Sequence, residues 1–360
     1  LSSAGSGDCF ILSLDVNGNF VYAKAFGGTD HDVAYDIALD EGIAIYVTGT
    51  YTGTADFDPS IAVLSRTSNG GNDAFVISLD LLGNINWVNT FGGIGGELSR
   101  SIATDLDGNI YTAGSFNDLI DFDENGSGYN VTSNGSYDAF LLKLDLNGGF
   151  TWVNTFGSSG TDMGHAVSID SVKNVYYSGR FSGIVDFDPS ASILDLTSTA
   201  LNSSPFIVKT DSINNFSWAL TFNTDNQIYE ANIALHDGIY FSAGFMDNLD
   251  ADPNIPVANL VSNGVRDICM VKLQVCQTST YTQIETSCDS IIWIDGNTYT
   301  SNNNTATHTL TNAAGCDSIV TLNLTINNST SGTDTQTACE SYLWIDGNTY
   351  TSSNNTATHT

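Results

Sequence analysis

The sequence predicts an all-β protein in which four-stranded sheets repeat side by side, as the blades of a β-propeller, and are followed by short Thr-rich β repeats. Two internal periods predict this organisation, a longer one of about 65 residues and a shorter one of about 51 residues, and a fixed period indicates one supersecondary unit copied in space. No helical periodicity separates the strand-like segments, which argues against a parallel α/β fold.

The longer period is carried by an Asp-x-Phe segment and a Phe-Gly-Gly segment that recur in matching order. The copies of the first segment begin at Asp8, Asp73 and Asp138, at equal spacing, and weaken at Ser204 and Asp267. The chain begins in the middle of one repeat and ends in the middle of another. We therefore expect it to be part of a larger protein.

One repeat contains four strand candidates, over residues 101–105, 110–114, 138–144 and 151–156. Gly108 and Gly148, which follow Asp and Asn, supply the positive φ that tight hairpin turns require. The third candidate is apolar on both faces, with Phe140 and Leu142 on one and Leu141 on the other. Such a strand is typical of a sheet between two neighbouring sheets, as in a propeller blade. A solenoid, or a row of separate sandwiches, is the alternative.

The segments 138–145, 152–157 and 102–105 carry a likeness to a known family. They resemble the SBBP-type β-propeller repeats of Bacteroidota cell-surface proteins, and the resemblance covers roughly residues 1–275. It implies a scaffold more than an activity. Propellers of that family usually have seven blades, whereas this chain has four complete repeats with partial ends, so the number of blades stays open.

After Val275 the repeated sequence pattern changes, and a segment that begins at Cys288 recurs at Cys339. Thr alternates with apolar residues over 319–326, which predicts a strand with one buried face. These units resemble the immunoglobulin-like (Ig-like) repeats of giant Bacteroidota adhesins. The domains that we expect are a propeller portion at 1–275, an Ig-like β-sandwich repeat at 276–327 and a truncated second repeat at 328–360.

A complete C-terminal unit carries two cysteines, which are Cys288 and Cys316 in the first copy. A domain of about 50 residues buries little apolar surface and gains from a covalent staple. Cysteines in such a short region also suit an oxidising compartment. We therefore predict a disulfide between Cys288 and Cys316. Free thiols, or a bond from Cys276 to Cys288, are the alternatives.

The charge balance excludes some classes of partner. The chain has 40 acidic and nine basic residues, a net charge of −31, and no basic run. This argues against nucleic acid and anionic membrane surfaces, because phosphate binding needs clustered Lys and Arg. No apolar run reaches the roughly 18 residues of a membrane span, so we expect no direct membrane insertion. Abundant Gly, Asn, Ser and Thr are typical of an extracellular or cell-surface β protein.

Paired aspartates recur once per repeat and form the clearest candidate site. The pairs are Asp56 and Asp58, Asp121 and Asp123, Asp186 and Asp188, and Asp250 and Asp252. Residues i and i+2 of an extended segment lie on one side, so both carboxylates can converge on one cation. Ca²⁺ takes six to eight oxygen ligands, and loop carbonyls could complete the set. Turn capping ahead of a following Pro is the competing interpretation, and the sequence leaves both open.

Four Asp-Ser-Ile or Asp-Ser-Val segments look like the O-glycosylation signal of exported Bacteroidota proteins. This resemblance implies glycans on Ser171, Ser212, Ser290 and Ser318. Export, by the same family resemblance, would use the type IX secretion system.

No catalytic constellation stands out, because the sequence has no zinc spacing, nucleophile elbow or phosphate loop. A sialidase-like carboxylate site is disfavoured because the arginines occupy unrelated repeat positions, at Arg66, Arg100, Arg180 and Arg266. We predict a non-catalytic, secreted adhesin-like protein that binds a glycan or protein on another surface. One alternative is a carbohydrate-binding or carbohydrate-cleaving propeller with exposed aromatics at Tyr51, Phe116 and Phe181. Another is a structural surface-layer or filament subunit.

Overall fold

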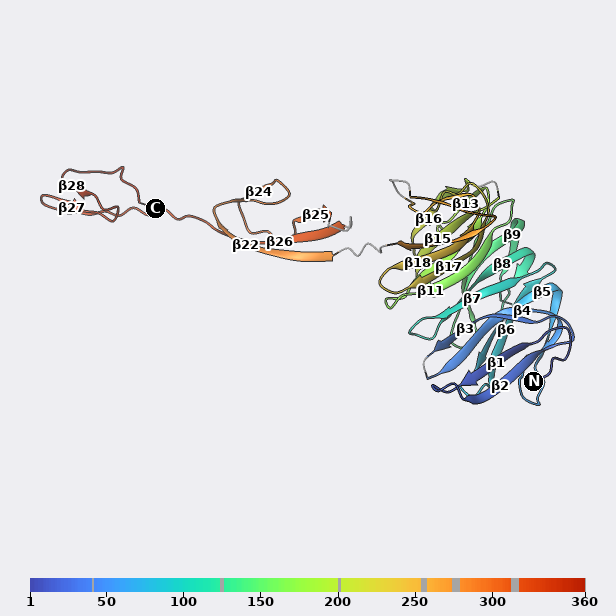
Figure 1. Ribbon diagram of the computed structural model, residues 1–360. Coiled ribbons are helices and arrows are strands. Elements are labelled where there is room, and N and C mark those ends of the chain that lie inside the picture. Colours follow the sequence, from blue (N-terminus) through green and yellow to red (C-terminus); the bar gives the residue numbers. More distant parts are fainter. Residues whose placement is uncertain are drawn as a thin grey trace. The chain divides into compact units, whose positions relative to one another are not determined.

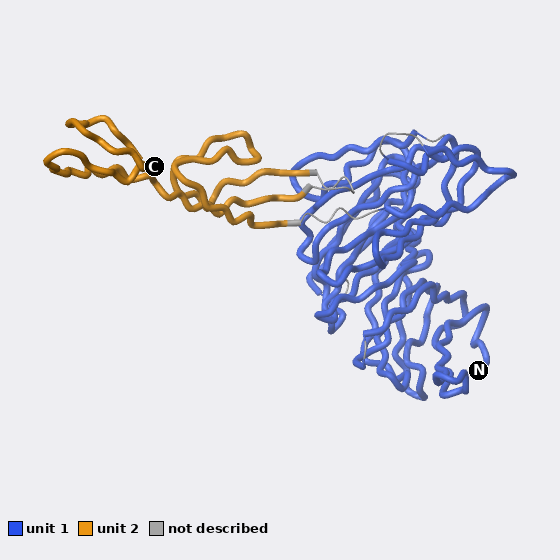
Figure 2. The backbone as a smooth tube through the Cα atoms, turned by 60° about the vertical axis from the view of Figure 1, so that its left-hand side comes forward, with its two compact units in different colours: residues 1–275 blue, residues 276–360 orange. Residues whose placement is uncertain are grey.

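The computed structural model describes residues 1–40, 42–123, 126–199, 202–253, 258–273, 279–311 and 317–359. All of the elements in these ranges are β-strands, and no helix occurs among them. The chain divides into two compact units, Leu1–Val275 (unit 1) and Cys276–Thr360 (unit 2), which Figure 2 shows in different colours. The part of the chain described here has no helix that is long and apolar enough to cross a membrane.

We divide the main strands of unit 1 into an N-terminal hairpin and four antiparallel sheets in chain order (Figure 1). The hairpin and the first two of these sheets are hydrogen-bonded to one another as one ten-stranded sheet. The N-terminal hairpin consists of β1 (Cys9–Leu14) and β2 (Phe20–Gly28). Sheet 1 consists of β3 (Val33–Asp40), β4 (Ala44–Asp56), β5 (Ser65–Leu79) and β6 (Ile85–Gly93). Sheet 2 consists of β7 (Leu98–Thr104), β8 (Ile110–Asp121), β9 (Asn130–Leu144) and β10 (Phe150–Phe156). Sheet 3 consists of β11 (Met163–Ile169), β12 (Asn174–Phe181), β15 (Ser204–Asp211) and β16 (Phe216–Thr221). Sheet 4 consists of β17 (Ile228–Leu235), β18 (Ile239–Phe245) and β21 (Asp267–Leu273).

Each sheet extends into a small hairpin beyond its second and third strands. In sheets 1 and 2 this hairpin is formed by the far ends of β4 with β5 and of β8 with β9. The glycines that end β2 and β6 pair with these far ends of β4 and β8, so each sheet is also bonded to the preceding one. In sheets 3 and 4 the hairpin is separate, as β13 (Ile184–Asp186) with β14 (Asp195–Thr197) and β19 (Asn248–Asp250) with β20 (Asn259–Val261). The paired aspartates lie at these hairpins.

The third strand of sheet 2, β9, is buried on both faces, as its sequence predicts. Phe140 and Leu142 belong to a core cluster that includes residues of sheet 1, such as Phe91. Leu141 belongs to the next cluster, together with Val175 of sheet 3. The core therefore lies between sheets. Burial of apolar surface stabilises each of these interfaces by about 25 cal/mol per Å² of buried area. The first strands β3, β7, β11 and β17 contact one another in turn (Figure 1).

The aromatics that we expected on an exposed loop face are buried, which corrects that part of the sequence analysis. Tyr51, Phe116 and Phe181 are 1%, 0% and 0% exposed. Each packs edge-on against the Phe of an Asp-Phe-Asp segment. Ring centroids are 5.2 Å apart for Tyr51 and Phe57, and 5.5 Å apart for Phe116 and Phe122. The Phe between the two aspartates folds inward as the core plug of the hairpin and covers these rings.

Unit 2 has a three-stranded sheet in the order β22 (Ser279–Cys288), β26 (Asp317–Asn327) and β25 (Thr307–Thr311), with β22 and β26 parallel. Two further hairpins occupy matching positions of the shorter period, β23 (Ile291–Ile292) with β24 (Thr298–Tyr299) and β27 (Tyr342–Leu343) with β28 (Thr349–Tyr350). Val320, Leu322 and Leu324 are buried under Trp293, which confirms one buried face for β26. In the described residues of unit 2, only the two-stranded sheet of β23 and β24 packs on this core, through Ile291 and Tyr299, so the strands of a complete Ig-like sandwich are not shown.

The cysteines within the described ranges are free. Cys288 and Cys339 are exposed, and Cys9 and Cys269 are buried in unit 1. Cys316, the predicted partner of Cys288, lies outside the described residues, as does Cys276.

Candidate functional site

The first strand of each sheet bulges at the same position of the repeat. The register shifts lie between Ala34 and Asp36, Ser99 and Ser101, Gly164 and Ala166, and Tyr229 and Asn232. The residues in the bulges are Tyr35, Arg100, His165 and, in β17, Glu230 with Ala231. Tyr35, Arg100, His165 and Glu230 follow one another at the constant spacing of the repeat, and we name these four the bulge row. A bulge turns its side chain out of the strand pleat and is often found beside functional sites. Because β3, β7, β11 and β17 are adjacent, the four bulges lie in one series.

Arg100 is the centre of the bulge row. Its Nη1 lies 3.7 Å from Oε1 of Glu230, and its guanidinium carbon lies 5.8 Å from the centre of the Tyr35 ring. The side chain of Glu230 is 68% exposed and that of Arg100 25% exposed, so this ion pair is open to solvent. Exposed pairs of this kind contribute about 0–1 kcal/mol to stability. Glu230 has a φ of 48°, an uncommon value for a residue other than Gly.

A second guanidinium lies close to the first. Arg180, from β12, places Nη1 3.5 Å from the carbonyl oxygen of Ile228 and Nη2 3.0 Å from Sδ of Met163. Burial lowers the pKa of Arg180, and the positive charge of Arg100 lowers that pKa further. The Nε atoms of both arginines are buried and have no hydrogen-bond partner among the described residues. Glu230, Tyr229 and Asp162 act on the pKa of Arg180 in the opposite direction, so the charge of the two arginines is partly balanced.

His165 is a structural member of the bulge row. Its Nδ1 accepts a hydrogen bond of 2.8 Å from the backbone N–H of Ala231 in sheet 4. Burial lowers the pKa of His165 to about 3, and the charges of Arg100 and Arg180 act in the same direction. The imidazole is therefore neutral, so it joins two sheets without adding charge.

The arginines occupy different repeat positions, as the sequence analysis states, but two of them interact in the fold. The positive charge of Arg100 lowers the pKa of Arg180. Arg266 stacks on Tyr229, with its guanidinium carbon 3.4 Å from the ring centre, and Tyr229 in turn affects the pKa of Arg180. The sequence did contain a signal for the position of Arg100, because Arg100 shares its repeat position with His165 and Tyr35.

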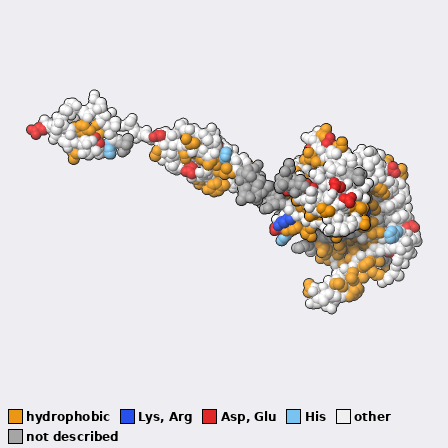
Figure 3. All heavy atoms as spheres, turned by 45° about the horizontal axis from the view of Figure 1, so that its top comes forward, with side chains coloured by type: hydrophobic (Ala, Val, Ile, Leu, Met, Phe, Trp, Pro, Cys, Tyr) orange, Lys and Arg blue, Asp and Glu red, His pale blue; other side chains and the backbone are white. Residues whose placement is uncertain are grey.

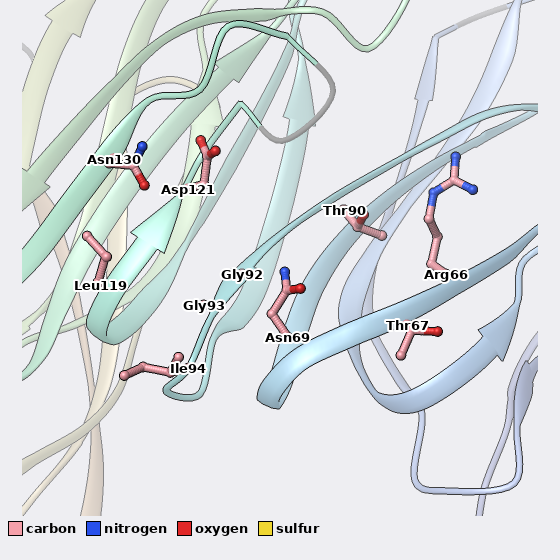
Figure 4. Close-up of a pocket in the computed structure, with 10 residues that line it drawn as sticks. All are labelled: Arg66, Thr67, Asn69, Thr90, Gly92, Gly93, Ile94, Leu119, Asp121 and Asn130. Atoms are coloured by element: carbon pink, nitrogen blue, oxygen red, sulfur yellow. The ribbon is translucent and has the colours of Figure 1, made fainter.

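A polar groove lies between neighbouring sheets and is built twice from equivalent positions. The larger one, of about 510 Å³, opens between sheets 1 and 2, where Figure 4 shows Asp121 and Asn130 across from Arg66. A second one, of about 220 Å³, is lined by Asp250 and Asn259, which occupy the same positions two repeats further along the chain. The repeat therefore produces grooves as well as sheets, and one member of two aspartate pairs lines them.

The paired aspartates bind their own backbone. In each pair Oδ1 of the first carboxylate accepts hydrogen bonds from the N–H groups two and eight positions later. For Asp121 the donors are Asp123 at 2.9 Å and Tyr129 at 2.7 Å. The same arrangement holds at Asp56, Asp186 and Asp250. These bonds favour turn capping. No group of three or more His, Cys, Asp or Glu side chains in the described ranges is placed to hold a metal.

Buried carboxylates at the Asp-x-Phe segments were missed by the sequence analysis. Asp73 and Asp138 are almost completely buried, and burial raises the pKa of each to about 6. Oδ2 of Asp73 accepts the N–H of Asn69 at 3.0 Å, and a Cβ at Gly92 would overlap the Asp73 carboxylate. The Gly of the Phe-Gly-Gly segment is therefore needed because an acidic side chain packs directly on it.

The serines with the glycosylation-like signal differ in exposure. Ser171 and Ser290 are exposed, whereas Ser212 and Ser318 are half-buried.

Comparison with known proteins gives a coarse placement. No known protein-family profile matches the chain. It is similar to an uncharacterized WD repeat-containing protein of Acanthamoeba polyphaga mimivirus, with 24% identity over 200 residues that cover 49% of this chain and 14% of that protein. The crystal structure of a protein of unknown function from Bacteroides caccae aligns with this chain with a TM-score of 0.30 and 10% identity. The alignment covers 66% of this chain and 82% of that protein chain.

The fold and the likeness to the mimivirus protein define an all-β repeat protein that is distantly like a WD-repeat, propeller-type protein. The chain spans 14% of the length of the mimivirus relative.

Proposed function

We propose that this chain is part of a non-catalytic, adhesin-like protein that is secreted to the cell surface. In this proposal residues 1–275 are a portion of a β-propeller that binds the partner, and the Thr-rich unit begins an Ig-like stalk. Type IX export, glycans on the exposed Ser171 and Ser290, and a disulfide from Cys288 to Cys316 belong to the same proposal. Calcium at the aspartate pairs remains a further hypothesis.

The bulge row is the observation that carries the proposal. The strands that carry the bulge keep an apolar residue two positions before it, which is Val33, Leu98, Met163 or Ile228, whereas the bulge itself changes from Tyr35 to Arg100, His165 and Glu230. A fixed framework with a varied position that is exposed at Tyr35 and Glu230 suits a binding surface, because the framework supplies rigidity and the varied position supplies specificity.

The partner in this proposal is a glycan or protein surface that presents an oxyanion. Arg100 and Arg180 offer two planar guanidinium groups, which match carboxylate, sulfate or phosphate oxygens in pairs. Tyr35 adds an exposed aromatic face beside them. A single oxyanion would relieve the repulsion between the two arginines. Nothing in the bulge row resembles the paired carboxylates of a glycosidase, because Glu230 is its only acid.

Glycan-array binding combined with an assay for released reducing sugar tests this proposal. We expect binding to acidic glycans over their neutral counterparts, and no release of sugar. Arg100→Gln should abolish the preference, whereas Arg66→Gln, at the separate groove, should leave it unchanged. Release of sugar would instead make the protein an enzyme. Equal binding of neutral and acidic glycans would contradict recognition of an oxyanion. The absence of any glycan or protein partner would contradict adhesion.

A further inference from the structure

Both polar grooves contain an Asp and an Asn that stand opposite one another on the two strands of a hairpin. In sheet 2 the register partner of Asp121 is Asn130, and in the hairpin of sheet 4 the register partner of Asp250 is Asn259. The first pair lines the groove of about 510 Å³, and the second pair lines the groove of about 220 Å³. We name these two pairs the Asp–Asn pairs.

The side chains of each Asp–Asn pair are arranged to meet a ligand. Oδ1 of Asp121 and Oδ1 of Asp250 each accept two backbone N–H groups, so both carboxylates are held in place. Asn130 and Asn259 are exposed, and among the described residues neither Nδ2 donates a hydrogen bond. Directly opposed residues have Cβ atoms roughly 4.5–5.5 Å apart. Each groove therefore presents a fixed carboxylate and an uncommitted amide side by side.

This arrangement matches a ligand with adjacent hydroxyl groups. A hydroxyl group both donates and accepts hydrogen bonds, so one hydroxyl can donate to the carboxylate while its neighbour accepts from the amide. In the larger groove Ile94 and Leu119, which are 74% and 49% exposed, add apolar surface for the C–H groups of the same ligand. The volume of this groove is within the range of about 300–1,000 Å³ of small-molecule sites.

The charges at the grooves disfavour a charged ligand that both grooves could share. In the smaller groove Asp225 accompanies Asp250, and the described residues that line it include no Lys or Arg, so an anion would be repelled. In the larger groove Arg66 lies across from Asp121 (Figure 4), so a lone cation would meet a positive charge. Figure 3 shows acidic side chains at the surface of unit 1 among uncharged atoms. A ligand that suits both grooves is therefore neutral.

We infer that each groove binds a neutral, polyhydroxylated sugar unit through its Asp–Asn pair. The hairpins of sheets 1 and 3 carry Ser65 and Asp195 at the position of the Asn, so one side chain creates the pair on a hairpin that all four sheets share. The grooves are separate from the bulge row. The inference therefore does not rest on the proposed recognition of an oxyanion.

Saturation-transfer NMR on the full chain tests the inference, with neutral disaccharides of glucose, galactose, mannose and N-acetylglucosamine as probes. The groove variant is Asn130→Ala with Asn259→Ala, which removes both exposed amides and keeps the hydrogen bonds that hold the hairpins. The matched control is Asn17→Ala with Asn147→Ala, because both of these Asn side chains are exposed in hairpin turns outside the grooves.

A second variant changes the charge of one pair instead of its size. Asn130→Asp reproduces in sheet 2 the opposed Asp186 and Asp195 that sheet 3 already contains, so the hairpin tolerates it. It should weaken sugar binding in the larger groove, because two carboxylates offer no N–H donor. Sodium sulfate serves as the charged probe that competes with the sugar.

We expect at least one neutral disaccharide to bind the native chain and the control equally. The groove variant should bind it about 3- to 10-fold more weakly, which is the effect of losing one hydrogen bond at each site. Arg100→Gln, in the bulge row, should leave this binding unchanged, so the failure of this inference is distinguishable from failure of the proposed function. The inference would be overturned if no neutral probe bound, if the groove variant bound as well as the native chain, or if sulfate displaced the sugar.

Discussion

The imidazole of His165 accepts a 2.8 Å hydrogen bond at Nδ1 from the backbone N–H of Ala231, so the bulge of sheet 3 is fastened to the bulge of sheet 4. The N–H of Ala231 is freed by its own bulge and would otherwise be buried without a partner. A side chain from one repeat thus completes the backbone of the next. This explains how a varied position in the bulge row can also be structural.

Replacing His165 by Ala should lower the free energy of unfolding by about 1–3 kcal/mol, because a buried N–H loses its acceptor. Urea unfolding measures the change. The control is His31→Ala, which removes an exposed imidazole and should stay within about 0.5 kcal/mol of the native chain. Equal effects of the two substitutions would show that the hydrogen bond contributes nothing.

Replacing Phe122 by Ala should be among the most destabilising single changes in unit 1, at about 3–5 kcal/mol. Its ring lies 5.3 Å from that of Phe140 and 5.5 Å from that of Phe116, all fully buried. The substitution leaves a cavity at the junction of the hairpin and the sheet. Leu119→Ala removes a half-exposed neighbour and is the control. Thermal denaturation of both variants decides whether Phe122 is a core plug.

Stability should fall as the pH rises through the range from about 4 to 6. Burial raises the pKa of Asp73 and of Asp138 from 3.8 to about 6, so the folded state binds protons that the unfolded state releases. Each group therefore weakens the fold by up to about 3 kcal/mol above pH 6, and this penalty disappears below pH 4. The nearby Asp162 carboxylate adds to the effect on Asp138.

The variant that isolates this effect is Asp73→Asn, which keeps an oxygen for the N–H of Asn69 and removes the charge. It should be at least as stable as the native chain at pH 7.5, and its melting temperature should vary less between pH 4 and pH 6. Asp195→Asn, at an exposed position of β14, is the matched control. A slope that is unchanged in Asp73→Asn would mean that this carboxyl is not the titrating group.

The role of the paired aspartates is tested with and without Ca²⁺. The hydrogen bonds of Asp121 predict that Asp121→Ala destabilises the hairpin by about 1–2 kcal/mol, equally in calcium and in a chelator at fixed ionic strength. A bound ion would instead raise the melting temperature of the native chain with calcium concentration, and Asp121→Ala would lose that response. Thermal scans of both proteins in both buffers distinguish the two interpretations.

The sheets were predictable because their signal is local and repeated. The apolar character of Phe140, Leu141 and Leu142 on both faces of one strand is enough to indicate neighbours on both sides. The burial of Tyr51 was not predictable, because it depends on Phe57 turning inward from a hairpin whose loop reads as polar. Alternation places Tyr51 on a strand face, but only the folded hairpin covers that face.

The bulge row escaped prediction for a different reason. Comparison of repeats looks for residues that stay the same, and this position carries Tyr35, Arg100 and His165 in turn. The closeness of Arg100 to Arg180 depends on the way in which adjacent strands of different sheets meet, and no spacing in the sequence encodes it. Asp73 was recognised as part of the repeated Asp-x-Phe segment. Its burial was not predicted, because it depends on Gly92, which has no side chain and lets the carboxylate pack against its backbone.

The double-sided burial of strands such as β9 has a consequence for how such a chain changes length. Each sheet is held by the sheets immediately before and after it, so energy is added in equal steps along the array. Duplication or loss of one whole copy of the repeat changes the length of the array without requiring a new kind of core between sheets. The bulges are less interchangeable, because His165 joins its sheet to the next one and Arg100 pairs with a residue two repeats further along the chain.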